Sequence, residues 1–361
     1  MSDGLRVLVV DDVEACRSVL INALGALSGV RVVGTASSGQ DALAQLDSLR
    51  PDMVLLDVEM PDMDGIATLC AIGKKRVETS VVMVSPSTQS GVEKTMKSLQ
   101  MGAFDFVSRP ADCDPSTQAE KLVNDLRRVV RAFVTRRSVG ALSDVLTTTQ
   151  TGQSARAASS AAVMSKVEVV ALGLSTGGPG ALDQLMPSLP GDLGVPVLIV
   201  QHMPSTFTPL LASMLDRRSA LRVTEARDGL WVEENTAYIA PGGRHMRVRQ
   251  CAEGVVIETT LDPPEQHCRP SVDYLFRSVS EVYGARALGV IMTGMGADGT
   301  HGLAAMKAKG AHILAQDEKS STVFGMPGAA AEAGLTDEQL PLDQLANRIV
   351  DLVVRSQNRN N

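Results

Sequence analysis

A serine surrounded by glycines is the first group in this chain whose type and spacing could do chemistry. Residues 173–177 read GLSTG, so Ser175 lies at the centre of a G-x-S-x-G pattern that directly follows the apolar run VEVVALGL. This pattern is typical of a tight strand-to-helix turn that presents a serine hydroxyl above the edge of a sheet. Glycine-rich turns can also bind phosphate groups, so the sequence offers two chemical alternatives for this turn.

The phosphate alternative lacks the residues that it needs. A phosphate-binding loop of the form G-x-x-x-x-G-K-[ST] requires a lysine after the glycines, and none follows here. Residues 178–180 read GPG and lack the third glycine of a dinucleotide-binding fingerprint at the proper spacing. The sequence therefore favours a nucleophilic role for Ser175.

A nucleophilic serine needs a base, and the base needs an acid that orients it. His202 directly follows the apolar run VPVLIVQ, and Asp298 lies in TGMGADG, directly after ALGVIM. If the three runs are neighbouring parallel strands, Ser175, His202 and Asp298 meet at one edge of the sheet. His301 is the competing base, although we expect it to begin a helix beyond Asp298. The Thr176 backbone N–H is the candidate oxyanion donor, and the TGMGADG loop is expected to supply a second.

A second group of side chains is acidic. Asp11 and Asp12 follow the run LRVLVV, and Asp57 ends the run MVLLD. Because the carboxyl ends of parallel strands share one edge of a sheet, these carboxylates should converge, and oxygen ligands of this kind suit Mg²⁺. Ser85 closes the run VVMVS and Arg109 closes FDFVSR, so a hydroxyl and a cation are expected at the same edge.

The elements that must position these groups alternate between strand-like and helix-like runs. In the first half, strand-like runs at 5–10, 30–36, 52–57, 80–85 and 104–108 are separated by segments with helical spacing of apolar residues. This alternation predicts a doubly wound (βα)5 domain with a parallel sheet. In the second half, runs at 167–174, 195–201, 287–293 and 311–316 predict an α/β domain with a mostly parallel sheet. Residues 234–249 and 254–260 predict an antiparallel section beside it.

The chain is expected to form two domains joined by a linker. Its 361 residues are many for a single hydrophobic core. Residues 138–165 are rich in Ser, Thr, Ala, Gly and Gln and poor in large apolar side chains, which is typical of a flexible linker. We therefore expect one domain over 1–137, a linker over 138–165 and a second domain over 166–357.

The overall composition excludes several classes of function. A net charge of -7 and a pI of about 5.4 disfavour a broad nucleic-acid-binding or anionic membrane-binding face. The five cysteines are scattered and contain no CxxC pair, which disfavours a disulfide framework and a zinc ribbon. No segment approaches the roughly 20 apolar residues of a membrane span, and the N-terminus does not resemble a signal peptide. These features predict a cytoplasmic protein without membrane insertion.

The acidic group and its flanking segments resemble the receiver domain of two-component response regulators. The segments that carry the resemblance are VVDD, LLDVEMPDMDG and GAFDFVSRP. The resemblance implies that Asp57 accepts a phosphoryl group from a histidine kinase, with Mg²⁺ bound at the same place. The implied Mg²⁺ ligands are Asp11, Asp12, Asp57 and the backbone carbonyl of Glu59, and the implied switch residues are Ser85, Phe106 and Arg109. Arg109 stands where receivers normally carry lysine, and its permanent charge can still pair with a phosphoryl group.

The second half resembles the catalytic domain of the chemotaxis protein-glutamate methylesterases, a family whose members also carry an N-terminal receiver. Six segments carry the resemblance in order: GLSTGGPGAL, VQHMPSTFT, AYIAPGGRHM, HCRPSVDYLF, GVIMTGMGADG and FGMPGAA. The resemblance implies that Ser175 is the nucleophile, His202 the base and Asp298 the orienting acid, with no cofactor at this site. Leu174 and Ala297 depart from the usual family sequence, but neither is at a catalytic position.

The same resemblance implies a substrate and its control. Family members remove methyl groups from glutamyl methyl esters of chemoreceptors with release of methanol, and many also deamidate receptor glutamines. Phosphorylation of the receiver is expected to regulate this hydrolase, and a monomer is expected. From the residues alone, a serine hydrolase acting on another ester or amide stays open. A scaffold or DNA-binding regulator is disfavoured by the acidic pI, the complete triad and the lack of a helix-turn-helix segment after the linker.

Overall fold

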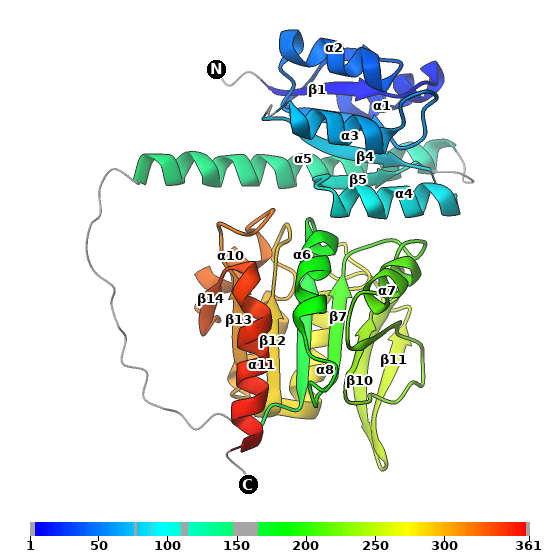
Figure 1. Cartoon of the computed structure of the whole chain (residues 1–361). Coiled ribbons are helices and arrows are strands. Elements are labelled where there is room, and N and C mark those ends of the chain that lie inside the picture. Colours follow the sequence, from blue (N-terminus) through cyan, green and yellow to red (C-terminus); the bar gives the residue numbers. More distant parts are fainter. Residues whose placement is uncertain (1–3, 76–77, 87, 110–114, 147–164, 359–361) are drawn as a thin grey trace. The chain divides into compact units, whose positions relative to one another are not determined.

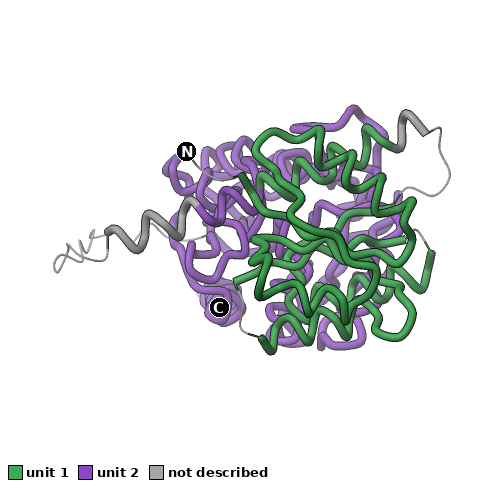
Figure 2. The backbone as a smooth tube through the Cα atoms, turned by 90° about the horizontal axis from the view of Figure 1, so that it is seen from above, with its two compact units in different colours: residues 1–131 green, residues 132–361 purple. Residues whose placement is uncertain are grey.

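The computed structural model describes residues 4–75, 78–86, 88–109, 115–146 and 165–358 (Figure 1). These residues form two compact units, Met1–Arg131 and Ala132–Asn361 (Figure 2). Each unit contains its own parallel sheet, with polar candidate residues at the carboxyl ends of its strands.

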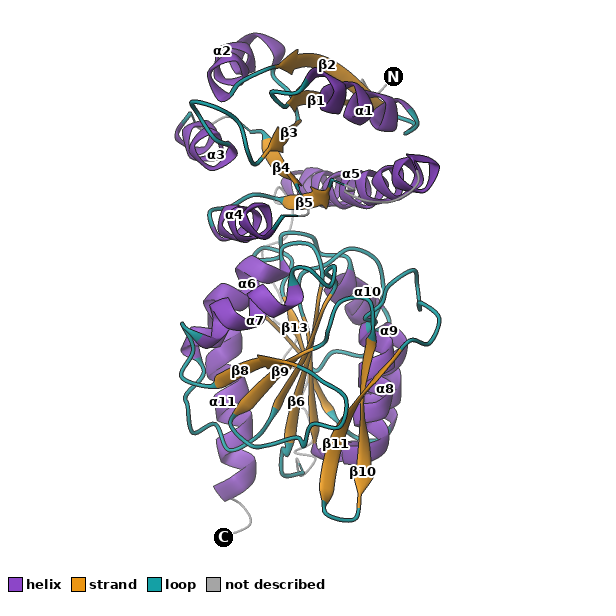
Figure 3. Cartoon of the chain, turned by 90° about the vertical axis from the view of Figure 1, so that its right-hand side faces the viewer, coloured by secondary structure: helices purple, strands orange, loops and turns teal. Residues whose placement is uncertain are grey.

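The first unit contains a five-stranded parallel sheet with strand order β2-β1-β3-β4-β5 (Figure 3). Its elements are β1 (Leu5–Val10), α1 (Glu14–Gly25), β2 (Val30–Ala36), α2 (Gly39–Leu49), β3 (Met53–Asp57), α3 (Gly65–Lys74), β4 (Ser80–Ser85), α4 (Gln89–Gln100), β5 (Asp105–Ser108) and the first part of α5 (Pro115–Leu146), a helix that continues past Arg131. Strand β3 is buried along its whole length, which is typical of a central strand covered by helices on both faces. Because β1 and β3 are neighbours, the acidic residues at their carboxyl ends lie close together.

The second unit contains a seven-stranded sheet with strand order β14-β13-β12-β6-β7-β9-β8, in which every pairing is parallel. Its strands are β6 (Val169–Leu174), β7 (Val197–Gln201), β8 (Arg222–Glu225), β9 (Thr236–Ile239), β12 (Ala287–Ile291), β13 (His312–Gln316) and β14 (Glu338–Leu340). Its α-helices are α6 (Gly178–Leu185), α7 (Thr208–Asp216), α8 (Val272–Tyr283), α9 (Thr300–Ala308), α10 (Met326–Glu332) and α11 (Leu342–Asn358). A separate antiparallel hairpin consists of β10 (His245–Cys251) and β11 (Gly254–Thr260).

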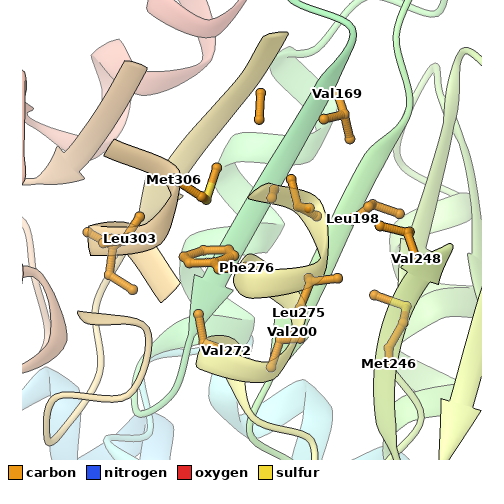
Figure 4. Close-up of a cluster of buried hydrophobic side chains, with 14 of the residues drawn as sticks. Val169, Leu198, Val200, Met246, Val248, Val272, Leu275, Phe276, Leu303 and Met306 are labelled. Atoms are coloured by element: carbon orange, nitrogen blue, oxygen red, sulfur yellow. The ribbon is translucent and has the colours of Figure 1, made fainter. Parts of the chain in front are cut away.

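Helices cover both faces of the seven-stranded sheet. Figure 3 shows α6, α7 and α11 on one face and α8, α9 and α10 on the other. Helix α8 contributes the fully buried Leu275 and Phe276 to a hydrophobic cluster (Figure 4), which also contains Leu198 of β7 and Met246 of the hairpin. The cluster holds α8 between the sheet and the hairpin, and this fixes where the helix begins.

The predicted fold class is confirmed, with one correction in the antiparallel section. Residues 234–249 were expected to be antiparallel, but β9 is a strand of the parallel sheet, and the hairpin begins only at His245. The burial patterns explain the difference. All four residues of β9 are buried, as in a strand covered on both faces. In contrast, β10 has both buried and exposed positions, as in a hairpin with one solvent-exposed face.

Part of the segment expected to be the linker, 138–165, lies in a helix. Helix α5 continues to Leu146, so the first part of the expected linker 138–165 is helical. Residues 147–164 of that range lie outside the described residues. Among the described residues, no helix has both the length and the apolar character that crossing a membrane requires.

Candidate active site

The three candidate catalytic residues follow three neighbouring strands. Strand β6 lies between β12 and β7 and is parallel to both. Ser175 comes directly after β6, His202 directly after β7, and Asp298 lies in the loop between β12 and α9. Two backbone hydrogen bonds join these strand ends, from Ser175 N to Thr293 O (3.0 Å) and from His202 N to Leu174 O (3.1 Å). The topology therefore brings the three residues to one edge of the sheet.

The turn after Ser175 depends on glycine. Gly177 has a φ of 80°, in the left-handed region that favours glycine, and a Cβ atom there would lie 2.3 Å from Thr322 Oγ1. A Cβ atom on Gly178 would lie 1.8 Å from Gln201 Oε1. The glycines thus give the chain the clearance to turn sharply from β6 into α6, with the serine at the turn.

Gly177→Ala should lower the free energy of unfolding of the second unit by about 3 kcal/mol, because it adds a steric clash to an unfavourable backbone conformation. Gly334→Ala is the matched control. Gly334 has a φ of 68°, but no atom lies within 4 Å of the position that an added methyl group would take, so only the conformational cost of about 1 kcal/mol applies. Urea denaturation followed by circular dichroism measures both values. Equal losses for the two variants would contradict the proposed clash.

His202 and Asp298 form a close pair. His202 Nε2 lies 2.7 Å from Asp298 Oδ2, and both side chains are largely buried. Burial acts to raise the pKa of Asp298, but the hydrogen bond and charge of His202 and two backbone N–H groups outweigh it and lower the pKa to about 2. Asp298 is therefore a carboxylate that can only accept hydrogen bonds, so Nε2 carries a proton and donates it.

The start of helix α8 holds the carboxylate of Asp298. Its Oδ1 accepts hydrogen bonds from Ser271 Oγ (2.9 Å) and Asp273 N (3.0 Å), and its Oδ2 accepts one from Val272 N (2.7 Å). Helix N-termini favour negative charge because their first N–H groups have no partner within the helix. This support was not predicted from the sequence. A signal was present, since Ser271 directly precedes the helix and is an N-cap residue type.

The second ring nitrogen of His202 is the one available as a base. Because Nε2–H is donated to Asp298, the lone pair of a neutral imidazole lies on Nδ1. Nδ1 is 3.6 Å from the Sγ atom of Cys268. Among the described residues, no hydrogen bond joins His202 to Ser175 Oγ, and such contacts are often formed only when a substrate is bound. No motif or spacing in the sequence pointed to Cys268.

Polar contacts around the serine hold the neighbouring peptides in place. Gln201 Nε2 donates to the backbone carbonyls of Ser175 (2.9 Å) and His202 (3.1 Å). Thr293 Oγ1 donates to the carbonyl of Thr176 (2.9 Å), so the peptide that follows the serine is tied to the loop after β12. Gly294 of that loop packs against Ser175, since a Cβ atom on it would lie 2.8 Å from Ser175 Cβ. The loop from which a second oxyanion donor was expected therefore borders the serine.

The other histidines have different environments. The side chain of His301, the competing base, is 81% exposed, and its Nδ1 lies 3.4 Å from Asp273 Oδ2. His245 is buried, stacks on Tyr274 and accepts the backbone N–H of Ser271 at Nδ1. Within the described parts of the chain, neither histidine forms a hydrogen bond or ion pair with Asp298, and this favours His202 as the base.

The acidic group of the first unit also converges. Side-chain oxygens of Asp11, Asp12 and Asp57 lie within 4.8 Å of one another. Arg109 Nη2 reaches Asp11 Oδ2 (2.5 Å) and Asp57 Oδ1 (3.0 Å), so the arginine occupies the place expected for the lysine. Burial is the main cause that raises the pKa of Asp57 to about 6, and the charge of Asp11 adds to it, while Arg109 acts in the opposite direction. Two buried carboxylates, Asp11 and Asp57, with the exposed carboxylate of Asp12 beside them, are a donor set that fits a divalent cation.

The remaining receiver candidates lie around this group. Ser85 is buried at the end of β4 and accepts a hydrogen bond from Thr95 Oγ1 (2.8 Å), which links it to α4. Phe106 is buried in β5. The exposed side chain of Glu59 contacts Ser90 Oγ (3.2 Å) in α4, and the ligand expected from Glu59 is its backbone carbonyl.

Comparison with protein families gives two matches. A family described as CheB methylesterase matches residues 170–349, and one described as response regulator receiver domain matches residues 7–119. The first match contains all three of the candidate catalytic residues, and the second contains the acidic group.

Curated relatives and a solved structure agree with these matches. A protein of Desulfotalea psychrophila named protein-glutamate methylesterase/protein-glutamine glutaminase is 43% identical over 360 residues, which cover 97% of this chain and 99% of the relative. A protein of Trichodesmium erythraeum with the same name is 41% identical over 346 residues, which cover 96% of this chain and 98% of the relative. The crystal structure of the Thermotoga maritima CheB methylesterase catalytic domain is 38% identical with a TM-score of 0.51, and the match covers 52% of this chain and 100% of that one. The chain therefore belongs to the CheB methylesterase family and carries a response regulator receiver domain ahead of the methylesterase domain.

Proposed function

We propose that this chain is a phosphorylation-regulated protein-glutamate methylesterase that also deamidates glutamines, acting on chemoreceptors in chemotaxis or a related chemosensory pathway. The observation that carries the proposal is the His202–Asp298 pair beside Ser175 at the ends of three neighbouring parallel strands. The names of the relatives supply the protein-glutamate and protein-glutamine substrates. The chemoreceptors follow from the resemblance of the sequence to the chemotaxis methylesterases. The receiver is assigned to 1–137 and the catalytic domain to 166–357, with the residues between them as the connection.

The first half of the reaction forms an acyl-enzyme. His202 Nδ1 takes the proton of Ser175 as the serine oxygen attacks the γ-carbonyl carbon of a glutamyl methyl ester. Asp298 keeps Nε2 protonated and stabilises the imidazolium that forms. The Thr176 N–H is the first donor to the developing oxyanion, and the loop after β12 supplies the second. The imidazolium then protonates the methoxide oxygen, and methanol leaves.

The second half returns the free enzyme. His202 takes a proton from water as the water oxygen attacks the acyl-enzyme, and Ser175 leaves with that proton. The product is a glutamate side chain. A glutamine side chain can follow the same route with ammonia as the leaving group, because both reactions pass through the same acyl-enzyme. The test of this function is release of methanol from methylated chemoreceptor membranes incubated with the purified full chain. Absence of release with several receptor types would contradict the proposed substrate class.

The activity should depend on pH through the base. Burial acts to lower the pKa of His202, but the charge of Cys268 and the hydrogen bond to Asp298 outweigh it and raise the pKa above its ordinary value of 6.5. Because the base must be neutral to accept a proton, kcat/KM should rise with pH and reach half its maximum above pH 6.5. In Cys268→Ser, this midpoint should move to lower pH. A pH–rate profile of methanol release for both proteins measures the midpoints, and an unchanged midpoint would contradict the role of Cys268 in raising the pKa.

The receiver is proposed to accept a phosphoryl group at Asp57 from a histidine kinase, with Mg²⁺ held by Asp11, Asp12, Asp57 and the Glu59 carbonyl. Bound Mg²⁺ would neutralise the charge on the phosphoryl oxygens during transfer. Arg109 already pairs with Asp57 and is placed to pair with the phosphoryl group. Ser85 and Phe106 are the proposed switch residues.

Asp57→Asn should remove the response to phosphorylation. Acetyl phosphate with Mg²⁺ is expected to change the rate of methanol release by the wild-type chain and to leave the Asp57→Asn rate unchanged, because the amide cannot be phosphorylated. Asp47→Asn, at an exposed carboxylate of α2 that pairs with Lys75, is the control that should keep the response. A response of equal size in Asp57→Asn would assign the phosphorylation to another residue. The protein is proposed to act as a monomer in the cytoplasm.

A further inference from the structure

A thiol lies against the proposed catalytic base. Cys268 Sγ is 3.6 Å from His202 Nδ1, and the other ring nitrogen is bonded to Asp298. The three ligand atoms of this cluster lie within 4.8 Å of one another. The order thiol, imidazole, carboxylate is that of a thiol-activating triad, so Cys268 occupies the position of a second nucleophile on the base that Ser175 uses.

The backbone holds the thiol in this position. Cys268 lies in the segment between β11 and α8, where its N–H donates to Glu265 O (2.7 Å) and its carbonyl accepts from Glu265 N (3.1 Å). Three residues later, Ser271 is bonded to Asp298. The same short segment therefore positions both the thiol and the carboxylate on either side of His202. Cys268 is half-buried, so small molecules in solution can reach it.

The hydrogen-bonding state of His202 favours transfer of the thiol proton. Because Nε2–H is donated to Asp298, Nδ1 has the lone pair that can accept the proton from Sγ. The pKa of His202 is raised, which favours the protonated ring that a thiolate needs beside it. Thiolates, not thiols, are the species that react with peroxides.

We propose that Cys268 is a redox modification site, at which hydroperoxides reversibly oxidise the thiol to a sulfenic acid and switch the hydrolase off. The proposal rests on the proposed function, because it takes His202 as the base of the hydrolase. In the step, Nδ1 takes the thiol proton and the thiolate attacks one peroxide oxygen. An S–O bond forms, the O–O bond breaks, and the leaving hydroxide receives the proton from the imidazolium. For hydrogen peroxide the products are one sulfenic acid and one water.

The modification blocks the nitrogen that Ser175 requires. The sulfenic acid on Cys268 can donate its own proton to Nδ1, and the resulting sulfenate oxygen then holds the imidazolium in an ion pair. A base that is protonated and paired cannot accept the serine proton. A thiol reductant reverses the change, since it converts the sulfenic acid to a mixed disulfide with loss of water, and a second thiol then releases Cys268.

Cys251 provides a matched control within the same unit. It is also half-buried and lies in the hairpin, where its Sγ accepts from Arg249 Nη1 (3.2 Å). Among the described residues, no histidine contacts this sulfur. The structure therefore predicts rapid oxidation at Cys268 and not at Cys251.

The experiment treats the full chain with hydrogen peroxide and follows methanol release and dimedone labelling of sulfenic acid, located by mass spectrometry. Wild type should lose most of its activity and regain it with dithiothreitol, with the label on Cys268. Cys268→Ser should release methanol after peroxide treatment at the same rate as before it. Cys251→Ser should lose activity as wild type does. Reversal by dithiothreitol separates this effect from methionine oxidation, which such thiols do not reverse. Equal loss of activity in Cys268→Ser, or label absent from Cys268, would overturn the proposal.

A second set of variants separates this proposal from the proposed function. Dimedone labelling of Cys268 should persist in Ser175→Ala and fall strongly in His202→Asn, because the base activates the thiol and the serine does not. These labelling results do not depend on any hydrolase activity. If methanol release were absent from the untreated chain while labelling still required His202, the proposed substrate would be wrong and the reactive thiol would stand. Equal labelling in His202→Asn would overturn activation of the thiol by the base.

Discussion

Ser175→Ala should abolish methanol release, with a fall in kcat of about 10⁴-fold or more, because it removes the hydroxyl that forms the acyl-enzyme in the proposed mechanism. Residual activity above the uncatalysed rate would come only from the oxyanion donors and substrate binding. The substitution removes one oxygen from a residue that is 4% exposed, and Ser175 Oγ makes no hydrogen bond among the described residues. The fold should therefore be unaffected, and circular dichroism and the urea midpoint should match those of wild type.

Two controls make this result specific. Ser213→Ala, at an exposed serine of α7 whose hydroxyl accepts from Arg217, should keep the wild-type rate. Phosphorylation of Asp57 by acetyl phosphate should persist in Ser175→Ala, since that reaction takes place in the other unit. Methanol release by Ser175→Ala at a rate near that of wild type would show that the nucleophile has been assigned wrongly.

Asp298→Asn should lower kcat by about 10⁴-fold while the overall fold is retained. An amide has no charge to stabilise the imidazolium. Its NH₂ group also cannot accept hydrogen bonds from the N–H groups that surround the carboxylate. If the amide oxygen takes the place of Oδ1 and accepts from Ser271 Oγ and Asp273 N, the NH₂ group takes the place of Oδ2. It then faces the Val272 N–H, which loses its acceptor, and His202, whose ring is forced into the wrong tautomer. KM should change much less than kcat, because Asp298 is not proposed to touch the substrate.

The same substitution should change the dependence of stability on pH. The pKa of Asp298 is lowered from 3.8 to about 2 in the folded protein, so the carboxylate stabilises the fold above pH 3.8 by about 2 kcal/mol. This contribution is lost as the pH falls from about 4 through about 2. In Asp298→Asn it should be absent throughout, so the free energy of unfolding should be lower at neutral pH and fall less steeply in acid.

Asp216→Asn is the control for this prediction. Asp216 accepts one backbone hydrogen bond, from Val223 N (2.7 Å), and lies outside the site. The kcat of the Asp216→Asn variant should stay near the wild-type value. If Asp298→Asn kept more than a tenth of the wild-type kcat, or unfolded in acid with the wild-type pH dependence, the orienting role of Asp298 would be rejected.

The sequence was sufficient for the fold class because hydrophobic periodicity records which faces are buried. Mostly apolar runs such as residues 167–174 predict covered parallel strands, and the structure has a parallel strand at Val169–Leu174. Strand β9 was misassigned because it is short and is followed by the glycine-rich turn before the hairpin. Pairing partners of short strands depend on contacts between distant segments, which periodicity does not record.

The candidate site was predictable only in part, for a related reason. The end of an apolar strand is visible in the sequence, so Ser175, His202 and Asp298 could be selected as residues that follow such runs. Their assignment as a catalytic triad stays a prediction that the variants above test. Cys268 could not be selected, since it lies 66 residues from its partner and follows no strand. Its contact with the imidazole exists only because the segment before α8 folds back to the sheet edge.

The way in which Asp298 is held has a consequence for engineering. Three of its four hydrogen bonds come from Ser271, which directly precedes α8, and from the first two residues of this helix, whose apolar side chains are locked into the core. The acid is thus anchored by a neighbouring helix more than by its own loop. Residues 295–297 of that loop could accordingly be varied in a library to alter substrate preference while the carboxylate keeps its position. Substitutions that shift α8, such as Phe276→Ala, would be expected to damage turnover from within the core, far from any contact with substrate.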